Sequence, residues 1–244
     1  MENMAMHAKN ILLKRTSKRD FLDKPVPNEI IDDLIETALS SPSASNTQPY
    51  RLAIATGDIR DALAEDLTRI FDKANSIKRS RTPLKLFRSW LKDAHPTSDI
   101  KPVMEYPTEL MQRRLECGSQ LYRTLGIARG DSKSRDHHLR KNFEFFGAPV
   151  VVFLFINSKL QTQSSLDAGI FLQSLMLSAI DYGLGTCAQG ALAIWTTPIK
   201  KHFQVDDNYK LICGLSLGYP SDHCVNKFSP SKRDRKSLEL HTVR

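Results

Sequence analysis

Apolar and polar positions near the start of the chain alternate in patterns that predict two helices and a strand. Residues 28–40 place their apolar side chains on one helical face, at spacings of one and four. Asn28 can cap this helix, and Pro42 stops it, because proline lacks the backbone N–H that a helix needs. The segment Arg51 to Thr56 is predicted to be a short strand, with Gly57-Asp58 as the turn that follows it. The apolar positions of the second helix are Leu63, Leu67, Ile70 and Phe71.

The second half of the chain holds the strongest signals. Pro149 to Ile156 is a continuous, β-branched apolar run, which is typical of a strand covered on both faces. Leu166 to Tyr182 predicts a helix that is apolar on nearly every side and crosses the protein's centre, with Gly183 as its C-cap. Thr197-Pro198 predicts the cap and first turn of a short helix, and Leu211 to Leu217 a last central strand.

The stretch between these halves is harder to assign. Residues 72–107 contain several prolines, a run of basic residues, and Phe87 near Trp90. They are predicted to form a partly helical insertion that acts as a lid, although a solvated surface excursion explains them equally well. Residues 108–128 resume a helical pattern. Because no repeat or domain boundary interrupts the chain, residues 1–244 are expected to form one α+β domain with a helix-covered sheet.

Composition and cysteine usage favour a globular protein of a reducing compartment. Hydrophobic residues make up 41% of the 244 residues and charged residues 25%, as in ordinary globular domains. The longest apolar run, Ala148 to Ile156, is far shorter than the roughly 20 residues that span a bilayer. Cys117, Cys187, Cys213 and Cys224 form no CxxC pair, so neither a disulfide framework nor a zinc site is expected. We therefore expect a cytoplasmic protein with no membrane contact and no metal.

The net charge of +8 is concentrated at the two ends of the chain. Residues 1–20 carry five basic and two acidic side chains, and residues 225–244 carry six and two. The 204 residues between them sum to only +1. Two basic ends suit a nucleic-acid binder, but they also suit a protein whose two ends converge on one phosphate group.

Two polar segments have the chemistry of a cofactor site. Arg15 to Arg19 (RTSKR) combines hydroxyl donors with guanidinium groups, which can bind a phosphate through two parallel bonds. Ser41 to Tyr50 (SPSASNTQPY) lies between a predicted helix and strand, and its hydroxyl and amide groups suit hydrogen bonding to a polar ring edge. Taken alone, each segment fits a solvated surface stretch better.

A third segment is rich in glycine, which lets the backbone approach a flat group closely. Gly183 to Gly190 (GLGTCAQG) has three glycines in eight residues. Its GxGxxxxG spacing, and its place directly after a helix, differ from the dinucleotide fingerprint, in which the glycines join a strand to a helix. A Rossmann domain is therefore not expected.

In this order, the three segments resemble the nitroreductase family of flavoproteins, over most of the chain from Asn10 onward. The resemblance rests on R-x-S-x-R-x-F at Arg15 to Phe21 and, above all, on the SPSASNTQPY segment. Further matching segments are Phe145 to Pro149, Asp167 to Gly185, and Leu211 to Pro220. Residues 122–149 are similar to the nitrobenzoate-reductase-like branch. The resemblance implies a mixed, largely antiparallel sheet covered by helices, in a homodimer with FMN at the subunit interface.

The resemblance also implies flavin contacts from two chains. One subunit would bind the FMN phosphate and ribityl groups through Arg15, Thr16, Ser17 and Arg19. The other subunit would contribute Pro42, Ser43, Ala44 and Asn46. The isoalloxazine ring would lie against Ala188, Gln189 and Gly190. There, a backbone N–H near the ring's N5 atom can tune its reduction.

A basic pair near the C-terminus is also implied at the phosphate. Alignment without a gap gives Ser229 and Lys232, whereas a two-residue insertion gives Lys232 and Arg235. We prefer Lys232 and Arg235, because Ser229 would forfeit a charge. This pair would explain why the excess charge lies at both ends of the chain.

Other reactive side chains are assigned structural roles. His137-His138 lacks nearby ligand partners and is predicted to lie at the surface. Cys187 is predicted to be a small packed residue near the flavin, and no Ser/His/Asp set or carboxylate pair stands out. The flavin itself would carry the chemistry, so no catalytic side chain is assigned.

The implied function is an FMN-dependent oxidoreductase with a ping-pong mechanism. NADH or NADPH would reduce the flavin and leave, and a small electron-poor acceptor, such as a nitroaromatic or a quinone, would then take the electrons. Two alternatives stay open: a low-turnover flavin-binding or sensing protein, and another chemistry of the family, such as flavin reduction or dehalogenation. A nucleic-acid partner is not expected.

Overall fold

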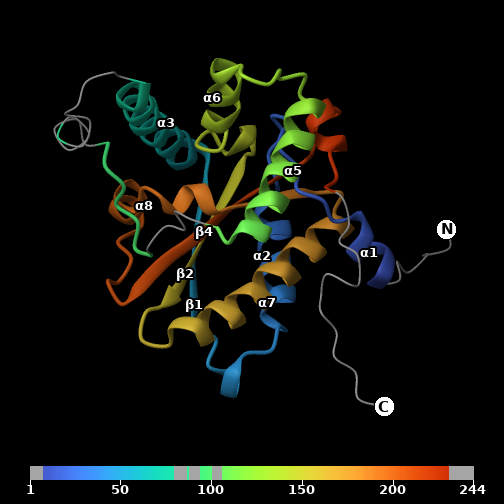
Figure 1. Ribbon diagram of the computed structural model, residues 1–244. Coiled ribbons are helices and arrows are strands. Elements are labelled where there is room, and N and C mark those ends of the chain that lie inside the picture. The colour runs from blue at the N-terminus through green and yellow to red at the C-terminus, as the bar shows by residue number, and fades with distance from the viewer. Residues whose placement is uncertain (1–7, 80–86, 88–93, 101–105, 231–244) are drawn as a thin grey trace, which may run out of the picture.

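Helices cover both faces of a central four-stranded sheet (Figure 1). The computed structural model describes residues 8–79, 87, 94–100 and 106–230. Its main elements are α1 (Ala8–Lys14), α2 (Asn28–Leu39), β1 (Tyr50–Thr56), α3 (Gly57–Arg79), α5 (Thr108–Thr124), α6 (Ser132–Arg140), β2 (Val150–Asn157), α7 (Gln161–Asp181), β3 (Gly185–Gln189), α8 (Thr196–Phe203) and β4 (Tyr209–Gly218). Short 3-10 turns are η1 (Ala44–Asn46), η2 (Phe145–Gly147), η3 (Gly190–Ala193) and η4 (Cys224–Lys227).

The sheet has the strand order β1-β2-β4-β3, and each neighbouring pair is antiparallel. β3 pairs with β4 on one side, where Cys187 lies opposite Ser216. On its other side, Thr186 forms an isolated parallel bridge with Ser17. This bridge places the segment around Ser17 along the edge of β3. The expected α+β fold with a largely antiparallel sheet is thus confirmed.

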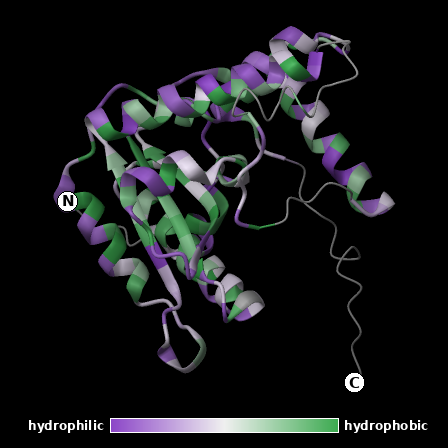
Figure 2. Ribbon diagram, turned by 90° about the vertical axis from the view of Figure 1, so that its left-hand side faces the viewer, coloured by the Kyte–Doolittle hydropathy of each residue, from purple (hydrophilic) through white to green (hydrophobic). Residues whose placement is uncertain are grey.

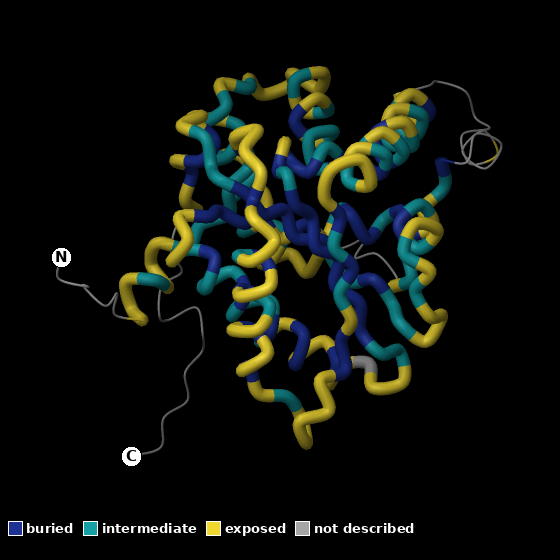
Figure 3. The backbone as a smooth tube through the Cα atoms, turned by 180° about the vertical axis from the view of Figure 1, so that it is seen from behind, coloured by how far each residue is buried: buried dark blue, intermediate teal, exposed yellow. Residues whose placement is uncertain are grey.

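β2 is buried on both faces, as its continuous apolar sequence predicts, and its residues alternate between two cores. Val151, Phe153 and Phe155 pack with residues of α3 and α8. The residues between them, such as Val152 and Leu154, pack with residues of α2 and α7. The strands are accordingly hydrophobic in Figure 2, and the centre of the molecule is buried in Figure 3.

α7 crosses the molecule and turns directly into β3 (Figure 1). Gly183 has φ +67°, a left-handed conformation that a residue with a side chain rarely adopts. The Gly183 N–H donates to the carbonyl of Ile180 and the Leu184 N–H to that of Ala179, which is the bonding of a Schellman motif. The predicted stop signal at Gly183 is therefore confirmed. The helix begins at Gln161, earlier than the predicted Leu166.

Several local predictions were wrong. Asn28 is the first residue of α2 rather than its cap, because Pro27 holds the cap position. α8 begins at Thr196, with Trp195 as its cap, so Thr197-Pro198 lies inside the first turn. No strand was predicted in the glycine-rich segment, but its middle forms β3 through pairing with β4, which a local pattern does not reveal. α1 and α6 were not predicted at all, because neither has a clear apolar periodicity.

The proposed lid lies mostly outside the described residues, and so does Trp90. Within residues 72–107, the first part continues α3 as far as Arg79. The stretch 94–100 is attached to the body of the protein: the Thr97 N–H donates to the Ile194 carbonyl, and Asp99 accepts from the Leu211 N–H. The lid stays a prediction. Among the described residues, no helix combines the length and the apolar character needed to cross a bilayer.

Candidate functional site

The end of β3 presents an open backbone surface. Ala188 is exposed although its neighbours Cys187 and Gln189 are buried. Gly190 is also exposed, and a Cβ atom added to it would meet nothing within 4 Å. Two of the three residues predicted to lie against a flat ring, Ala188 and Gly190, are therefore exposed.

Gln189 is held rigidly behind this surface. Its side-chain amide donates to the Asn142 carbonyl at 2.9 Å, and its oxygen accepts a hydrogen bond from the buried hydroxyl of Ser216. The strand end is thus joined to the segment after α6 and to the neighbouring strand β4. Such fixed hydrogen bonds keep a binding surface in one conformation.

Residues 15–19 run beside the edge of β3, and their side chains are partly exposed. The Lys18 N–H donates to the Thr186 carbonyl at 2.9 Å. The Arg19 N–H donates to Oδ1 of Asn226 at 2.7 Å, and the Lys18 ammonium donates to the Asn226 carbonyl at 3.0 Å. Asn226 therefore fixes the backbone of this segment against η4, which leaves the Arg19 guanidinium beside the Phe228 ring.

Cys187 follows Thr186, the β3 residue that pairs with Ser17. Burial raises the pKa of the Cys187 thiol to about 11, and the charges of Arg19 and Arg15 oppose this rise. Cys187 is 3% exposed, so the prediction of a packed residue is confirmed, and its thiol is protonated at neutral pH. Phosphate binding by Arg15, Thr16, Ser17 and Arg19 stays a prediction.

The loop with the SPSASNTQPY sequence is anchored to α7. The Ser41 hydroxyl donates to that of Ser174, and the Ala44 N–H donates to Oδ2 of Asp167 at 3.2 Å. Pro42, Ala44 and Asn46 are exposed and Ser43 is half-buried. Ser45, Asn46 and Gln48 have φ values of +50°, +53° and +43°, and positive φ is unusual for residues with side chains. The loop thus displays its polar groups in a constrained backbone.

Within one chain, this loop and the 15–19 segment do not form a common site. Ala44 is bonded to Asp167 in the first half of α7, whereas Ser17 pairs with Thr186, just beyond the end of that helix. The helix rises about 1.5 Å per residue, so its course from Asp167 to Asp181 alone spans about 21 Å. The two predicted halves of the flavin site therefore lie at different ends of α7 (Figure 1).

The C-terminal contacts Lys232 and Arg235 lie outside the described residues. The alternative residue, Ser229, is described and exposed. Residues 220–228 lie next to the 15–21 segment, through the Phe21–Pro220 bridge and the Asn226 hydrogen bonds. The chain therefore approaches its own basic N-terminal segment shortly before residue 232.

Sequence reasoning missed three residues of this region. His138 is 7% exposed, so the predicted surface position is wrong for it, although His137 is exposed as predicted. His138 packs against Tyr122 and Phe146, which its own helix pattern does not indicate. Asn142 and Asn226 act through hydrogen bonds to distant residues, and no local signal marks such partners.

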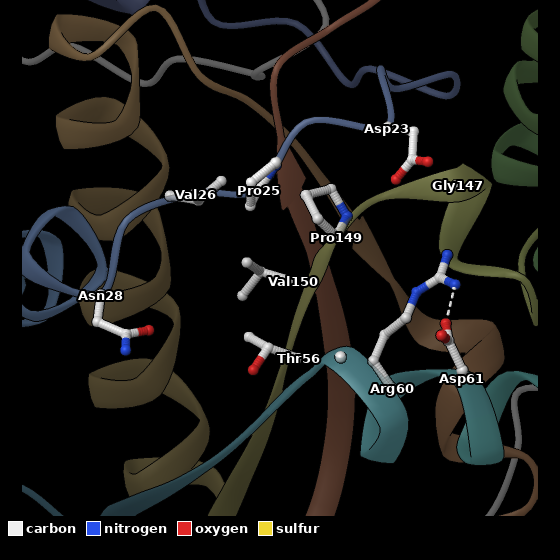
Figure 4. Close-up of a pocket in the computed structure, with 11 residues that line it drawn as sticks. Asp23, Pro25, Val26, Asn28, Thr56, Arg60, Asp61, Gly147, Pro149 and Val150 are labelled. Carbon is white, nitrogen blue, oxygen red and sulfur yellow. Dashed lines mark hydrogen bonds and ion pairs between the residues drawn. The ribbon is translucent and has the colours of Figure 1, made fainter.

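A separate cavity of about 390 Å³ lies at the start of β2 (Figure 4). Its residues include Asp23, Thr56 and Arg60 but none of the predicted flavin contacts. The Arg60 side chain is already engaged, because it donates to the carbonyls of Ala148 and Glu144 and pairs with Asp61. This cavity is therefore not the candidate site.

Comparison with known proteins identifies the family. The model described as the nitroreductase family matches residues 12–219. The chain belongs to the nitroreductase family. It is 32% identical to a 4-nitrobenzoate reductase from Pseudomonas putida over 219 residues, which cover 88% of this chain and 86% of that protein. The resemblance drawn from the motifs is thus confirmed.

Solved structures of the family share the fold. The FMN-dependent nitroreductase NfnB from Mycobacterium smegmatis, in complex with NADPH, superimposes with a TM-score of 0.82 at 30% identity, covering 97% of this chain and 98% of that one. The FMN- and NADPH-dependent nitroreductase NfnB from Sphigopyxis sp. strain HMH gives a TM-score of 0.84 at 26% identity, covering 98% and 100%.

Proposed function

We propose that this nitroreductase family member is an FMN-dependent enzyme that uses NADPH or NADH to reduce nitroaromatic or similar electron-poor acceptors. The open strand end at Ala188 and Gly190, on a strand whose edge pairs with the basic 15–19 segment, is the observation that carries the proposal. The names of its relatives, which are FMN-dependent nitroreductases and 4-nitrobenzoate reductases, support it.

The residues present fit FMN. Its phosphate needs cations and hydrogen-bond donors, which Arg15, Thr16, Ser17 and Arg19 supply in one partly exposed segment. Its flat ring needs a surface without projecting side chains, which Ala188 and Gly190 supply. FMN, when bound, would supply the hydride and electron transfer between donor and acceptor.

The protein's own residues would bind and orient the groups that react. The strand end would position the ring edge through backbone N–H groups, and Gln189 would keep that strand in place through Asn142 and Ser216. Cys187, with its pKa raised to about 11, would take no part as a nucleophile. We assign no side chain as a catalytic acid or base.

We further propose a homodimer in which each flavin contacts two chains. The 15–19 and 42–46 segments lie at different ends of α7 within one chain, so a second chain is needed to bring them together. α7 also has an apolar stripe that joins neither core cluster, formed by Leu166, Ile170, Leu177 and Ile180, of which Leu177 faces α1. Leu166 is 60% exposed. Large apolar faces of this kind are typical of permanent dimer interfaces.

The test is the absorption spectrum of the purified protein before and after anaerobic NADPH or NADH. A flavin spectrum that bleaches with NADPH, and recovers when a nitroaromatic is added, is the expected result. Flavin released by denaturation should be FMN rather than FAD. A bound flavin that neither nucleotide bleaches would instead indicate a storage or sensing protein, and a protein that never retains added FMN would refute the proposal.

A further inference from the structure

A second cavity, of about 510 Å³, lies between the end of α5, α6 and η4 (α5 and α6 are labelled in Figure 1). Its cationic or ionisable lining residues are Lys133, His137, His138, Lys141 and His223, and its lining contains no carboxylate. We call it the α6 cavity. A lining with one sign of charge concentrates ions of the opposite sign, so this cavity attracts anions.

Two acidic residues on or just after α6 are engaged elsewhere. Asp136 pairs with Arg79 and accepts a hydrogen bond from Asn75, and Glu144 pairs with Arg140. Within the part of the chain that the structure describes, no ion pair reaches Lys133 or Lys141. The two ammonium groups thus leave a local positive charge without a counterion from these residues.

His138 is a buried polar side chain of this cavity that has no hydrogen-bond partner among the described residues. It is 7% exposed, and its ring lies against those of Tyr122 and Phe146. His138 also lines the cavity. Burial, followed by the charges of Arg19 and Lys141, lowers the pKa of His138 to about 4. The N–H of the neutral His138 ring can therefore donate a hydrogen bond to an acceptor atom of a ligand in this cavity.

The α6 cavity is connected to the candidate flavin site through the chain at Lys141 and Asn142. Lys141 directly precedes Asn142, whose carbonyl accepts the hydrogen bond from Gln189 at the end of β3. Arg19, which does not line the cavity, bonds through its backbone N–H to Asn226 of η4, and η4 also contributes Cys224 to the cavity lining. The cavity thus begins within one residue of the contact that holds the proposed ring-binding strand.

We propose that the α6 cavity binds the carboxylate of an aromatic acid and thereby selects anionic aromatic acceptors. Leu125 and Ile127 supply an apolar wall opposite the cations, which fits an aromatic body better than a bare phosphate. The cavity volume lies in the range of about 300–1,000 Å³ that is usual for small-molecule sites. The assignment of the ligand as an acceptor rests on the proposed function, whereas the binding of the anion does not.

Calorimetric titration of the FMN-loaded protein tests this proposal, with benzoate and its neutral isostere benzamide as probes that undergo no reduction. We expect benzoate to bind at least about tenfold more tightly than benzamide, because an ammonium–carboxylate bond is charge-assisted. Lys141→Gln should weaken benzoate binding by about tenfold and leave benzamide binding unchanged. Lys133→Glu, at an exposed position that cannot disturb the core, should weaken benzoate binding further.

Lys159→Gln is the matched control, because Lys159 is exposed on the turn before α7 and does not line the cavity. Equal affinity for benzoate and benzamide, or equal losses in Lys141→Gln and Lys159→Gln, would overturn the proposal. Tighter binding of inorganic phosphate or adenosine 2′-phosphate, in competition with benzoate, would overturn it in favour of a phosphate site. Because none of these titrations needs turnover, a failure of NADPH to bleach the flavin would count against the proposed function alone.

Discussion

Gln189 and Asn142, which are 47 positions apart in the chain, are joined by a 2.9 Å hydrogen bond from the glutamine amide to the asparagine carbonyl. The bond ties the end of β3 to the segment that follows α6. It makes the proposed ring-binding strand and the α6 cavity parts of one rigid unit. A ligand bound in the cavity is therefore held at a fixed place relative to that strand.

Arg19→Ala should weaken FMN binding by about 10- to 150-fold while the protein stays folded. A charge-assisted bond contributes roughly 1.5–3 kcal/mol, and 1.4 kcal/mol is about a factor of ten in affinity. The backbone bond from Arg19 to Asn226 survives the substitution, so the segment keeps its position. Arg19→Lys should restore only part of the affinity, because lysine keeps the charge but not the planar fork.

Fluorescence quenching during a flavin titration measures this effect. Arg69→Ala is the control, since Arg69 is exposed on α3 and pairs with Asp66. If Arg19→Ala and Arg69→Ala bind FMN like the parent protein, Arg19 is only a surface charge.

Gly190→Ala should weaken FMN binding without lowering the stability of the protein. A methyl group at Gly190 meets nothing within 4 Å, so the melting temperature of the FMN-free protein should not change. The same methyl group would project where the ring is proposed to lie and should weaken FMN binding.

Gly218→Ala should instead lower the stability of the protein. Its Cβ would lie 2.6 Å from Cδ of the Pro149 ring, which cannot move aside easily. Overpacking of this kind costs about 1–3 kcal/mol of stability. Thermal melts of both variants check the pair, and a large destabilisation by Gly190→Ala would contradict the open surface at β3.

Leu166→Glu should dissociate the proposed dimer and release the flavin together. Leu166 is 60% exposed in the single chain, so a charge there costs little folding energy unless a second chain covers it. Ile59→Glu is the control, because Ile59 is 50% exposed on α3, across the sheet from α7. Sedimentation should give about twice the 27.6 kDa chain mass for the parent and the control. A parent protein that sediments as a monomer and retains FMN would refute the shared site.

His138 should make the protein less stable at acid pH. Its pKa is about 4 in the folded chain, below the ordinary value of 6.5. Between these values the unfolded chain binds more protons than the folded one, so stability falls as the pH falls from about 6.5 towards 4. Above that window this residue contributes no pH dependence.

Urea denaturation across the same pH window measures the effect. His138→Gln should give a shallower loss of stability towards acid than the parent protein. His137→Gln, at the exposed neighbouring position, should follow the parent curve. Parallel curves for parent and His138→Gln would show that the imidazole stays solvated.

Much of the fold was predictable because its signals are local. Pro149 to Ile156 has apolar residues on both faces of the strand, so both faces are expected to be buried, and β2 is buried on both faces. The periodicity of residues 28–40 directly encodes the buried face of α2. Gly183 ends α7 as predicted, since the left-handed conformation is accessible to glycine at little cost.

Only those parts of the candidate site that lie in a sequence motif were predictable. The RTSKR and SPSASNTQPY segments carry their donors in the sequence itself, and they identify the family. The pairing of Ser17 with Thr186 and the anchoring of Ala44 by Asp167 join residues more than 100 positions apart, so no local pattern reveals them.

The sequence by itself determined the family, the main helices and strands, and the chemistry of the polar segments, because each depends on neighbouring residues. Only the tertiary structure decided which distant residues meet. It made β3 from a glycine-rich stretch by pairing it with β4, buried His138 against Tyr122 and Phe146, and brought the distant His223 to the same cavity as Lys133 and Lys141. Hydrogen-bond pairing and burial are properties of the packed chain, and a residue's own neighbours in sequence do not specify them.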